Sequence, residues 1–194
     1  EHAAVVGFSL GGNIVLKYLG DGEHELPDKL GVAGAVSVPC DLESSAIVGL
    51  RPENRFYTLN FLRNLKRKIR LKKDILPPRC GADRLKEVKN GVDFDRIYTA
   101  PLEGYDSAED YWRANSSRQF LENITVPTLV INALDDSFLG PESYPFKEAE
   151  KSRFVHLETP ENGGHVGFVS RGGGPDYWQE RRFAAFAASE LRPD

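Results

Sequence analysis

A serine near the start of the chain has the surroundings of a nucleophile. Residues 7–11 read Gly-Phe-Ser-Leu-Gly, a G-x-S-x-G pattern that sets a serine at the apex of a tight strand-to-helix turn. Such a turn strains the backbone and lifts the Ser9 hydroxyl clear of the sheet. We expect Gly7 and Gly11 to flank it because a Cβ would crowd the turn, and the Leu10 N–H to act as an oxyanion donor. The alternative to a catalytic Ser9 is an ordinary strand–helix turn, because glycine and serine are common and G-x-S-x-G alone is a weak signal.

A nucleophilic serine needs a base to take its proton and a carboxylate to orient that base. His165 lies in the loop Gly163 to Phe168, whose glycines allow it to fold close to the serine, and we predict that it is the general base. Asp135 and Asp136 end an apolar segment. We favour Asp136 as the acid, because a small turn is needed before a carboxylate can face the histidine, and Asp135 is then a turn residue. A solvated turn is the alternative for an aspartate pair.

Apolar segments that alternate with amphipathic ones would position these residues. We predict strands at residues 3–8, 31–39, 124–134 and 154–159, and helices at about 11–20, 141–152 and 176–191. Two of these strands are apolar throughout, as in a parallel sheet buried on both faces. The alternation predicts an α/β fold. It also places the candidate nucleophile, acid and base just past the carboxyl ends of strands, where open α/β sheets hold their active sites.

Residues 43–123 are charged and helical in pattern, and we predict a helical insertion within one domain that covers residues 1–194. Phe61, Leu65 and Ile69 recur at helical spacing, and seven Lys and Arg residues between positions 63 and 73 surround them. The simpler interpretation is the solvated face of an amphipathic helix. The alternative is a basic face that approaches an acidic lipid surface, giving peripheral membrane contact.

Composition excludes several classes of function. The chain has 194 residues, enough for one hydrophobic core, and its net charge of −4 gives no case for nucleic-acid binding. No run of eighteen apolar residues predicts a transmembrane helix, and we see no signal-peptide pattern. Cys40 and Cys80 form neither a disulfide framework nor a metal-ligand cluster, so we expect two reduced thiols and a cytoplasmic location. Membrane association through sequence upstream of this chain is the alternative.

Several blocks of sequence resemble one family. GFSLGGNIVLKYLG, VSVPCDL, FDRIYTAPLEGYDSAEDYWRANSS, ITVPTLVINALDDSF and GGHVGF are similar to successive parts of the YheT-like α/β-hydrolases, which include the abhydrolase-domain 1, 2 and 3 esterases. The order Ser, Asp, His is also that of α/β-hydrolases. The resemblance implies a carboxylic-ester hydrolase with Ser9, Asp136 and His165 as its triad and no cofactor. It implies short-chain esters, acylglycerols or phospholipids as substrates, and a cap at residues 43–123 that shapes the acyl pocket.

Two departures from the family's pattern are present. Ser137 stands where the family usually has Pro after the aspartate pair. The family's long N-terminal part, with the first strands and the second oxyanion donor, is not in this chain. We therefore expect an incomplete fold, unstable or inactive alone, with residues 3–8 as an exposed edge strand. Two other functions stay open: acyl transfer to alcohols, as in some yeast relatives, and a non-catalytic binding protein that kept the fold.

Overall fold

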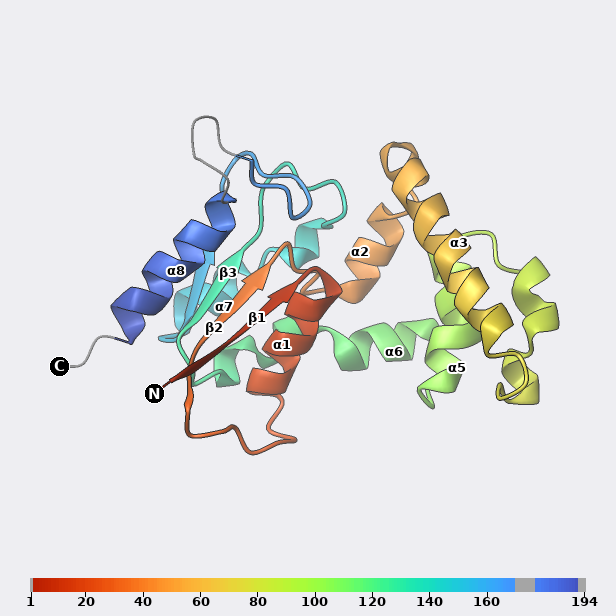
Figure 1. Cartoon of the computed structure of the whole chain (residues 1–194), viewed down its shortest axis with the longest axis horizontal. Helices are drawn as coiled ribbons and strands as arrows, with labels where there is room; N and C mark the ends of the chain where they lie inside the picture. The colour runs from red at the N-terminus through yellow and green to blue at the C-terminus, as the bar shows by residue number, and fades with distance from the viewer. Residues whose placement is uncertain (1, 170–176, 192–194) are drawn as a thin grey trace.

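Figure 1 shows the computed structural model of the chain, which describes residues 2–169 and 177–191. Within these ranges four strands form one parallel sheet in the order β1-β2-β3-β4. The strands are β1 (Ala3–Phe8), β2 (Leu30–Val36), β3 (Thr128–Ile131) and β4 (Val155–Glu158). Helices separate successive strands, so the predicted α/β class with a parallel sheet is confirmed.

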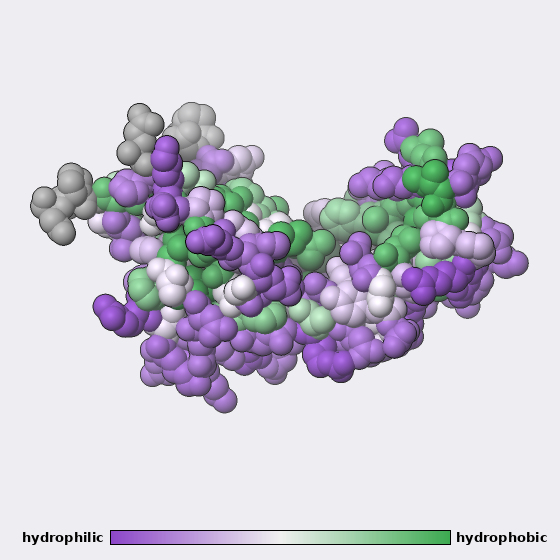
Figure 2. Space-filling model, turned by 90° about the horizontal axis from the view of Figure 1, so that it is seen from below, coloured by the Kyte–Doolittle hydropathy of each residue, from purple (hydrophilic) through white to green (hydrophobic). Residues whose placement is uncertain are grey.

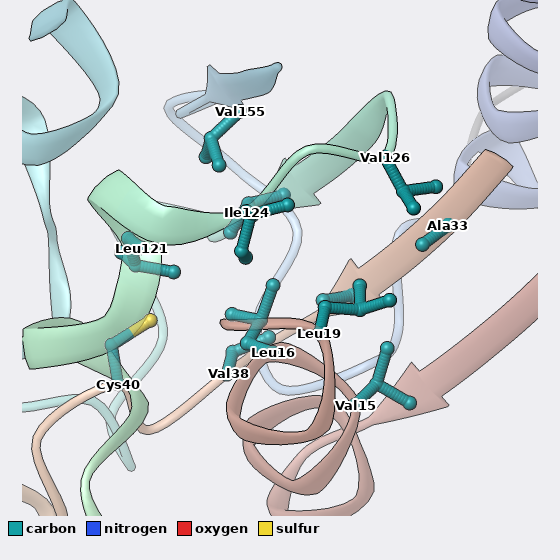
Figure 3. Close-up of a cluster of buried hydrophobic side chains, with 12 residues drawn as sticks. Val15, Leu16, Leu19, Ala33, Val38, Cys40, Leu121, Ile124, Val126 and Val155 are labelled. Atoms are coloured by element: carbon teal, nitrogen blue, oxygen red, sulfur yellow. The ribbon is translucent and has the colours of Figure 1, made fainter. Parts of the chain in front are cut away.

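Both faces of the sheet are covered by helices. Alternate residues of β2 point to opposite faces: Ala33 and Ala35 belong to the core cluster with α1 (Leu10–Gly20), whereas Val32 and Val36 belong to the cluster with α8 (Trp178–Glu190). Figure 3 shows the first cluster, in which Val15, Leu16 and Leu19 of α1 pack beside Val38, Leu121 and Ile124. Burial on both faces explains why the β2 segment is apolar throughout.

The strands end earlier than the apolar runs predict. β2 stops at Val36, and the next residue, Ser37, has a φ of 52°, which is outside the strand conformation. β3 stops at Ile131, and the next residue, Asn132, uses its side-chain amide to bind both the N–H and the carbonyl of Val38. Continued apolar sequence past these points fills the core rather than extending the ladder.

Two predicted helices also have different bounds. The segment predicted as a helix at residues 141–152 divides into a 3₁₀ turn, Pro141–Ser143, and α7 (Phe146–Lys151). The predicted last helix is α8, and its expected start at Asp176 lies outside the described residues. Where the structure describes the chain, no helix is both long enough and apolar enough to cross a bilayer.

Most of the segment between β2 and β3 forms a helical lobe, on the right in Figure 1. Its helices are α2 (Leu42–Val48), α3 (Arg55–Leu71), α4 (Gly91–Phe94), α5 (Ala100–Leu102) and α6 (Ala108–Asn115). The lobe's 3₁₀ turns are Pro52–Asn54, Pro78–Cys80 and Ala82–Lys86, and a π-helical turn spans Asp95–Thr99. The last 3₁₀ turn of the segment, Ser117–Asn123, packs against α1 instead, where its Leu121 belongs to the first core cluster. The lobe has its own hydrophobic cluster, comprising Leu62, Ile69, Cys80, Leu85, Val88, Phe94, Ile97 and Tyr98.

β1 lies at one edge of the sheet, as the sequence predicts. Its burial alternates only weakly, with Ala3, Ala4, Val6 and Phe8 exposed and Gly7 buried. The strand pairs with β2 along its whole length, from Ala3 to Phe8. This pairing fixes the position along the sheet at which β1 ends and α1 begins, and Ser9 lies at that point.

Candidate active site

Ser9 lies at a strained turn between β1 and α1. Its backbone has a φ of 52° and a ψ of −126°, and its N–H donates to the carbonyl of Val36 at the end of β2 at 2.8 Å. A non-glycine residue at positive φ costs roughly 1–3 kcal/mol and persists only where its surroundings hold it. The pairing of β1 with β2 and the start of α1 at Leu10 provide that constraint.

The glycines around the turn differ in how much space a Cβ would have. A Cβ on Gly7 would collide with the backbone carbonyl of Gly11, so the predicted need for Gly7 holds. The prediction for Gly11 is wrong, because a Cβ there would meet nothing within 4 Å. Gly12 is the second constrained position: its Cβ would lie 2.6 Å from Cγ2 of Val38. The close approach of α1 to the segment after β2 therefore requires glycine one residue later than expected.

The structure brings the three residues of the predicted triad into one hydrogen-bonded line. His165 Nε2 lies 2.9 Å from Ser9 Oγ, and His165 Nδ1 lies 2.9 Å from Oδ2 and 3.2 Å from Oδ1 of Asp136. The Asp136 side chain is fully buried, whereas that of His165 is 21% exposed. A neutral imidazole with its proton on Nδ1 can donate to the carboxylate and accept from the serine hydroxyl.

Asp135 has the separate position that the sequence suggests for a turn residue. Its Oδ1 accepts the backbone N–H groups of Gly163, at 2.9 Å, and Gly164, at 2.8 Å. The carboxylate therefore holds the start of the histidine loop and does not face the imidazole. The two adjacent aspartates therefore have different contacts. Asp136 contacts the ring of His165, and Asp135 contacts the backbone of the loop that carries His165.

Ser37 is a positioning residue that sequence reasoning missed. Its hydroxyl oxygen accepts the N–H of Val166, the residue after the histidine, at 2.9 Å. Both Ser37 and Val166 have positive φ, 52° and 56°. The available signal was a single hydroxyl residue inside the otherwise apolar run GVAGAVSVP. A buried hydroxyl needs a partner, and here the partner is the histidine loop.

The turn after Asp136 is tied to the helical lobe. Ser137 Oγ donates to Asn54 Oδ1 at 2.7 Å, and Asn54 Nδ2 donates to the Ser137 carbonyl at 2.6 Å. Ser137, the departure from the family's usual Pro, thus supplies a hydroxyl for a two-bond contact with a fully buried asparagine. The next residue, Phe138, donates its N–H to Asp136 Oδ1 at 2.9 Å, and its ring centroid lies 4.9 Å from that of His165.

Tyr144 and Cys40 are two further groups whose pKa values are raised. Burial and the charges of Asp136 and Asp135 raise the pKa of Tyr144 to about 12, and its hydroxyl donates to the carbonyl of Ala133 at 2.7 Å. Burial raises the pKa of the Cys40 thiol to about 12, and both Cys40 and Cys80 are free. In the described ranges, no group of three or more His, Cys, Asp or Glu is arranged to hold a metal ion.

A cavity of about 400 Å³ opens beside Ser9 and His165 and extends under the lobe. Its wall is mostly apolar and includes Leu42, Leu62, Phe94, Trp112, Phe138 and Leu139. Figure 2 shows the surface hollowed between the sheet part of the molecule and the lobe. The Leu10 residue lines the same cavity and is the first of α1, a position whose N–H has no acceptor within the helix.

Solved structures define the class of this fold. An esterase from Pyrococcus furiosus matches 98% of this chain and 54% of its own, with a TM-score of 0.53 at 15% identity. An α/β fold family hydrolase from Bacillus anthracis matches 98% of this chain and 67% of its own, with a TM-score of 0.50 at 16% identity. At these identities the likeness concerns the fold, and the chain has part of an α/β-hydrolase fold.

Sequence comparisons find relatives of this chain among esterases and lipases. The chain is 36% identical to the putative esterase YheT of Escherichia coli over 97% of its length, and 33% identical to human monoacylglycerol lipase ABHD2 over 84%. It spans 55% and 42% of these two proteins. No family model matches the chain. The resemblance to the YheT-like α/β-hydrolases is nevertheless confirmed, because the chain is homologous to esterases and lipases of that group over nearly all of its length.

Proposed function

We propose that the protein is a serine carboxylic-ester hydrolase that works through a Ser-His-Asp triad and an acyl-enzyme intermediate. The observation that carries this proposal is the line of hydrogen bonds from Ser9 through His165 to Asp136, at the mouth of an apolar cavity. The names of the homologues, which are esterases and lipases, support the general activity.

The mechanism follows from the atoms at the site. Ser9 Oγ attacks the acyl carbonyl carbon while His165 Nε2, 2.9 Å away, takes the hydroxyl proton. Asp136 holds the Nδ1–H tautomer and stabilises the imidazolium that forms. The Leu10 N–H and the N-terminus of α1 stabilise the oxyanion. His165 returns the proton to the leaving alcohol, and the same base then activates the water that hydrolyses the acyl-enzyme.

The cavity supports an acyl ester as the substrate. Its volume of about 400 Å³ and its mostly apolar wall suit a short- to medium-chain acyl group or part of a lipid. Residues of the segment 43–123 form most of that wall, which agrees with a cap that shapes the acyl pocket. The relative from Saccharomyces cerevisiae that is named monoacylglycerol lipase is 31% identical over 91% of the chain.

Acyl transfer to an alcohol is the second candidate activity. The chain is 29% identical, over 93% of its length, to a yeast protein named medium-chain fatty acid ethyl ester synthase/esterase 2. Chemically, an alcohol would replace water at the deacylation step and the triad would act unchanged. The intact hydrogen-bonded line speaks against the third possibility, a binding protein without catalysis.

Helix α3 suggests how a lipid substrate reaches the cavity. Its inner residues Leu62 and Leu65 line the cavity, whereas Phe56 and Leu71 on its outer side are 80% and 74% exposed. Eight Lys and Arg and no acidic residue occur between positions 55 and 73. Figure 2 shows hydrophobic residues beside hydrophilic ones on this lobe. Exposed apolar groups among cations favour peripheral contact with an anionic lipid surface.

Turnover of a panel of p-nitrophenyl esters by the natural full-length protein tests the proposal. We expect Ser9→Ala to lower kcat by about 10³-fold or more, whereas Ser45→Ala, which removes another hydroxyl from the cavity wall, keeps most of the activity. Analysis of products formed with ethanol present separates hydrolysis from transfer. Undiminished turnover by Ser9→Ala would refute the proposal, and no turnover by the wild type on any ester would favour a binding protein.

A further inference from the structure

One carboxylate in the cavity wall has no part in the triad. Asp95 begins the π-helical turn Asp95–Thr99 between α4 and α5, and it lines the same cavity as Ser9 and His165. Among the described residues of that wall it is the single carboxylate, and none is Lys or Arg. Single π-helical turns inside helical segments occur frequently at functional sites.

The partners of Asp95 are neutral. Thr99 Oγ1 donates to Oδ1 at 2.7 Å, and Trp112 Nε1 donates to Oδ2 at 3.0 Å. Burial raises the pKa of Asp95, and the two hydrogen bonds act in the opposite direction. Burial and the charge of Asp95 also raise the pKa of Tyr111, another residue of the cavity wall. The carboxylate therefore lies in a desolvated wall without a cation to balance it.

A carboxylate is energetically unfavourable as a purely structural link between the π-helical turn and α6. Desolvating a carboxylate is strongly unfavourable unless hydrogen bonds or a cation compensate it, and a neutral acceptor could bind Thr99 or Trp112 with a smaller desolvation penalty. Each carboxylate oxygen has two acceptor positions, and each accepts one bond from the protein. Asp95 thus retains acceptor capacity in the wall of the cavity that receives the substrate.

We propose that Asp95 is a hydroxyl-binding subsite, which accepts a hydrogen bond from a free hydroxyl group of the ester substrate. This inference rests on the proposed ester-hydrolase function. The hydroxyl belongs either to the alcohol part, as in a monoacylglycerol, or to the acyl part, as in an ester of a hydroxy fatty acid. An ester without such a hydroxyl leaves the carboxylate unpaired on binding, so the site discriminates against it.

The test compares three esters of the same medium-chain acid with the natural full-length protein: the monoacylglycerol, the ethyl ester, and the ethyl ester of the hydroxylated acid. We expect the wild type to have a kcat/KM about tenfold or more higher for at least one hydroxyl-bearing ester than for the plain ethyl ester. Asp95→Asn should reduce that preference by about ten- to a hundredfold. The hydroxyl-bearing ester that loses its advantage identifies which part of the substrate Asp95 binds.

The matched control is Thr99→Val, which removes a donor to Asp95 and keeps the carboxylate. We expect it to retain the preference for the hydroxyl-bearing ester, even if its stability falls. Preferences are ratios within one preparation, so the folded fraction cancels. Equal losses on all three esters in Asp95→Asn would overturn the subsite and leave a structural tie.

Wild-type data decide the question if Asp95→Asn does not fold. Equal kcat/KM values for the three esters would overturn the inference, whereas a preference of about tenfold or more supports it. The proposed function fails separately, if hydrolysis of the plain ethyl ester survives Ser9→Ala. Hydrolysis that depends on Ser9 but ignores the substrate hydroxyl would refute the Asp95 subsite alone.

Discussion

Replacing Asp136 by asparagine tests whether Asp136, rather than Asp135, is the carboxylate that orients His165. The buried Asp136 carboxylate has both oxygens within 3.2 Å of His165 Nδ1 and also accepts the Phe138 N–H. An amide has one oxygen, and its NH₂ group turned toward Nδ1 would favour the tautomer with the proton on Nε2. That tautomer cannot accept the Ser9 proton, so we expect kcat/KM to fall by about 10⁴-fold.

The assay is kcat/KM for a soluble p-nitrophenyl ester, with thermal unfolding measured on the same samples. Asp135→Asn is the matched control, because its remaining oxygen can still accept the N–H groups of Gly163 and Gly164. We expect this control to stay within about tenfold of the wild type, since only a positioning bond changes. A loss below tenfold in Asp136→Asn, or an equal loss in both folded variants, would refute the reasoning.

Three further predictions concern the turn, the histidine loop and the lobe. Gly7→Ala should abolish soluble expression or lower the Tm strongly, because the new Cβ would collide with backbone atoms. Gly11→Ala should leave the Tm within a few degrees of the wild type, because its Cβ meets nothing within 4 Å. Equal Tm values for the two variants would contradict this. Ser37→Ala should lower kcat/KM by about three- to tenfold through the lost Val166 bond, and an unchanged value would remove Ser37 from the site. Arg67→Glu with Arg70→Glu should weaken sedimentation with anionic vesicles and leave hydrolysis of a soluble ester unchanged; unaltered sedimentation, or binding to RNA instead, would refute the lipid contact.

Local signals in the sequence predict much of the fold and the order of the site. Apolar runs before Ser9, Asp136 and His165 indicate strands, and parallel strands bring their carboxyl ends to one edge of a sheet. The preference for Asp136 over Asp135 also rests on local geometry, and in the structure the Asp136 carboxylate contacts the His165 imidazole. Local pattern is enough for such inferences, because each depends on a few neighbouring residues.

Features that depend on distant residues could not be predicted in the same way. The contact of Ser37 with Val166 joins residues 129 positions apart, and that of Asn54 with Ser137 joins residues 83 apart. The ends of the strands follow the same rule: Asn132 binds Val38 across the sheet. Gly12, rather than Gly11, is constrained because of a side chain on another element. None of these partners is visible from local pattern.

Labelling of the natural full-length protein by a fluorophosphonate probe tests the central claim most directly. The reaction needs a serine activated by a base, so mass spectrometry should locate one adduct on the peptide that contains Ser9. Ser9→Ala should remove the adduct, and His165→Ala should slow its formation by orders of magnitude. An adduct on another serine, or labelling that persists in Ser9→Ala, would contradict the assignment of Ser9 as the nucleophile.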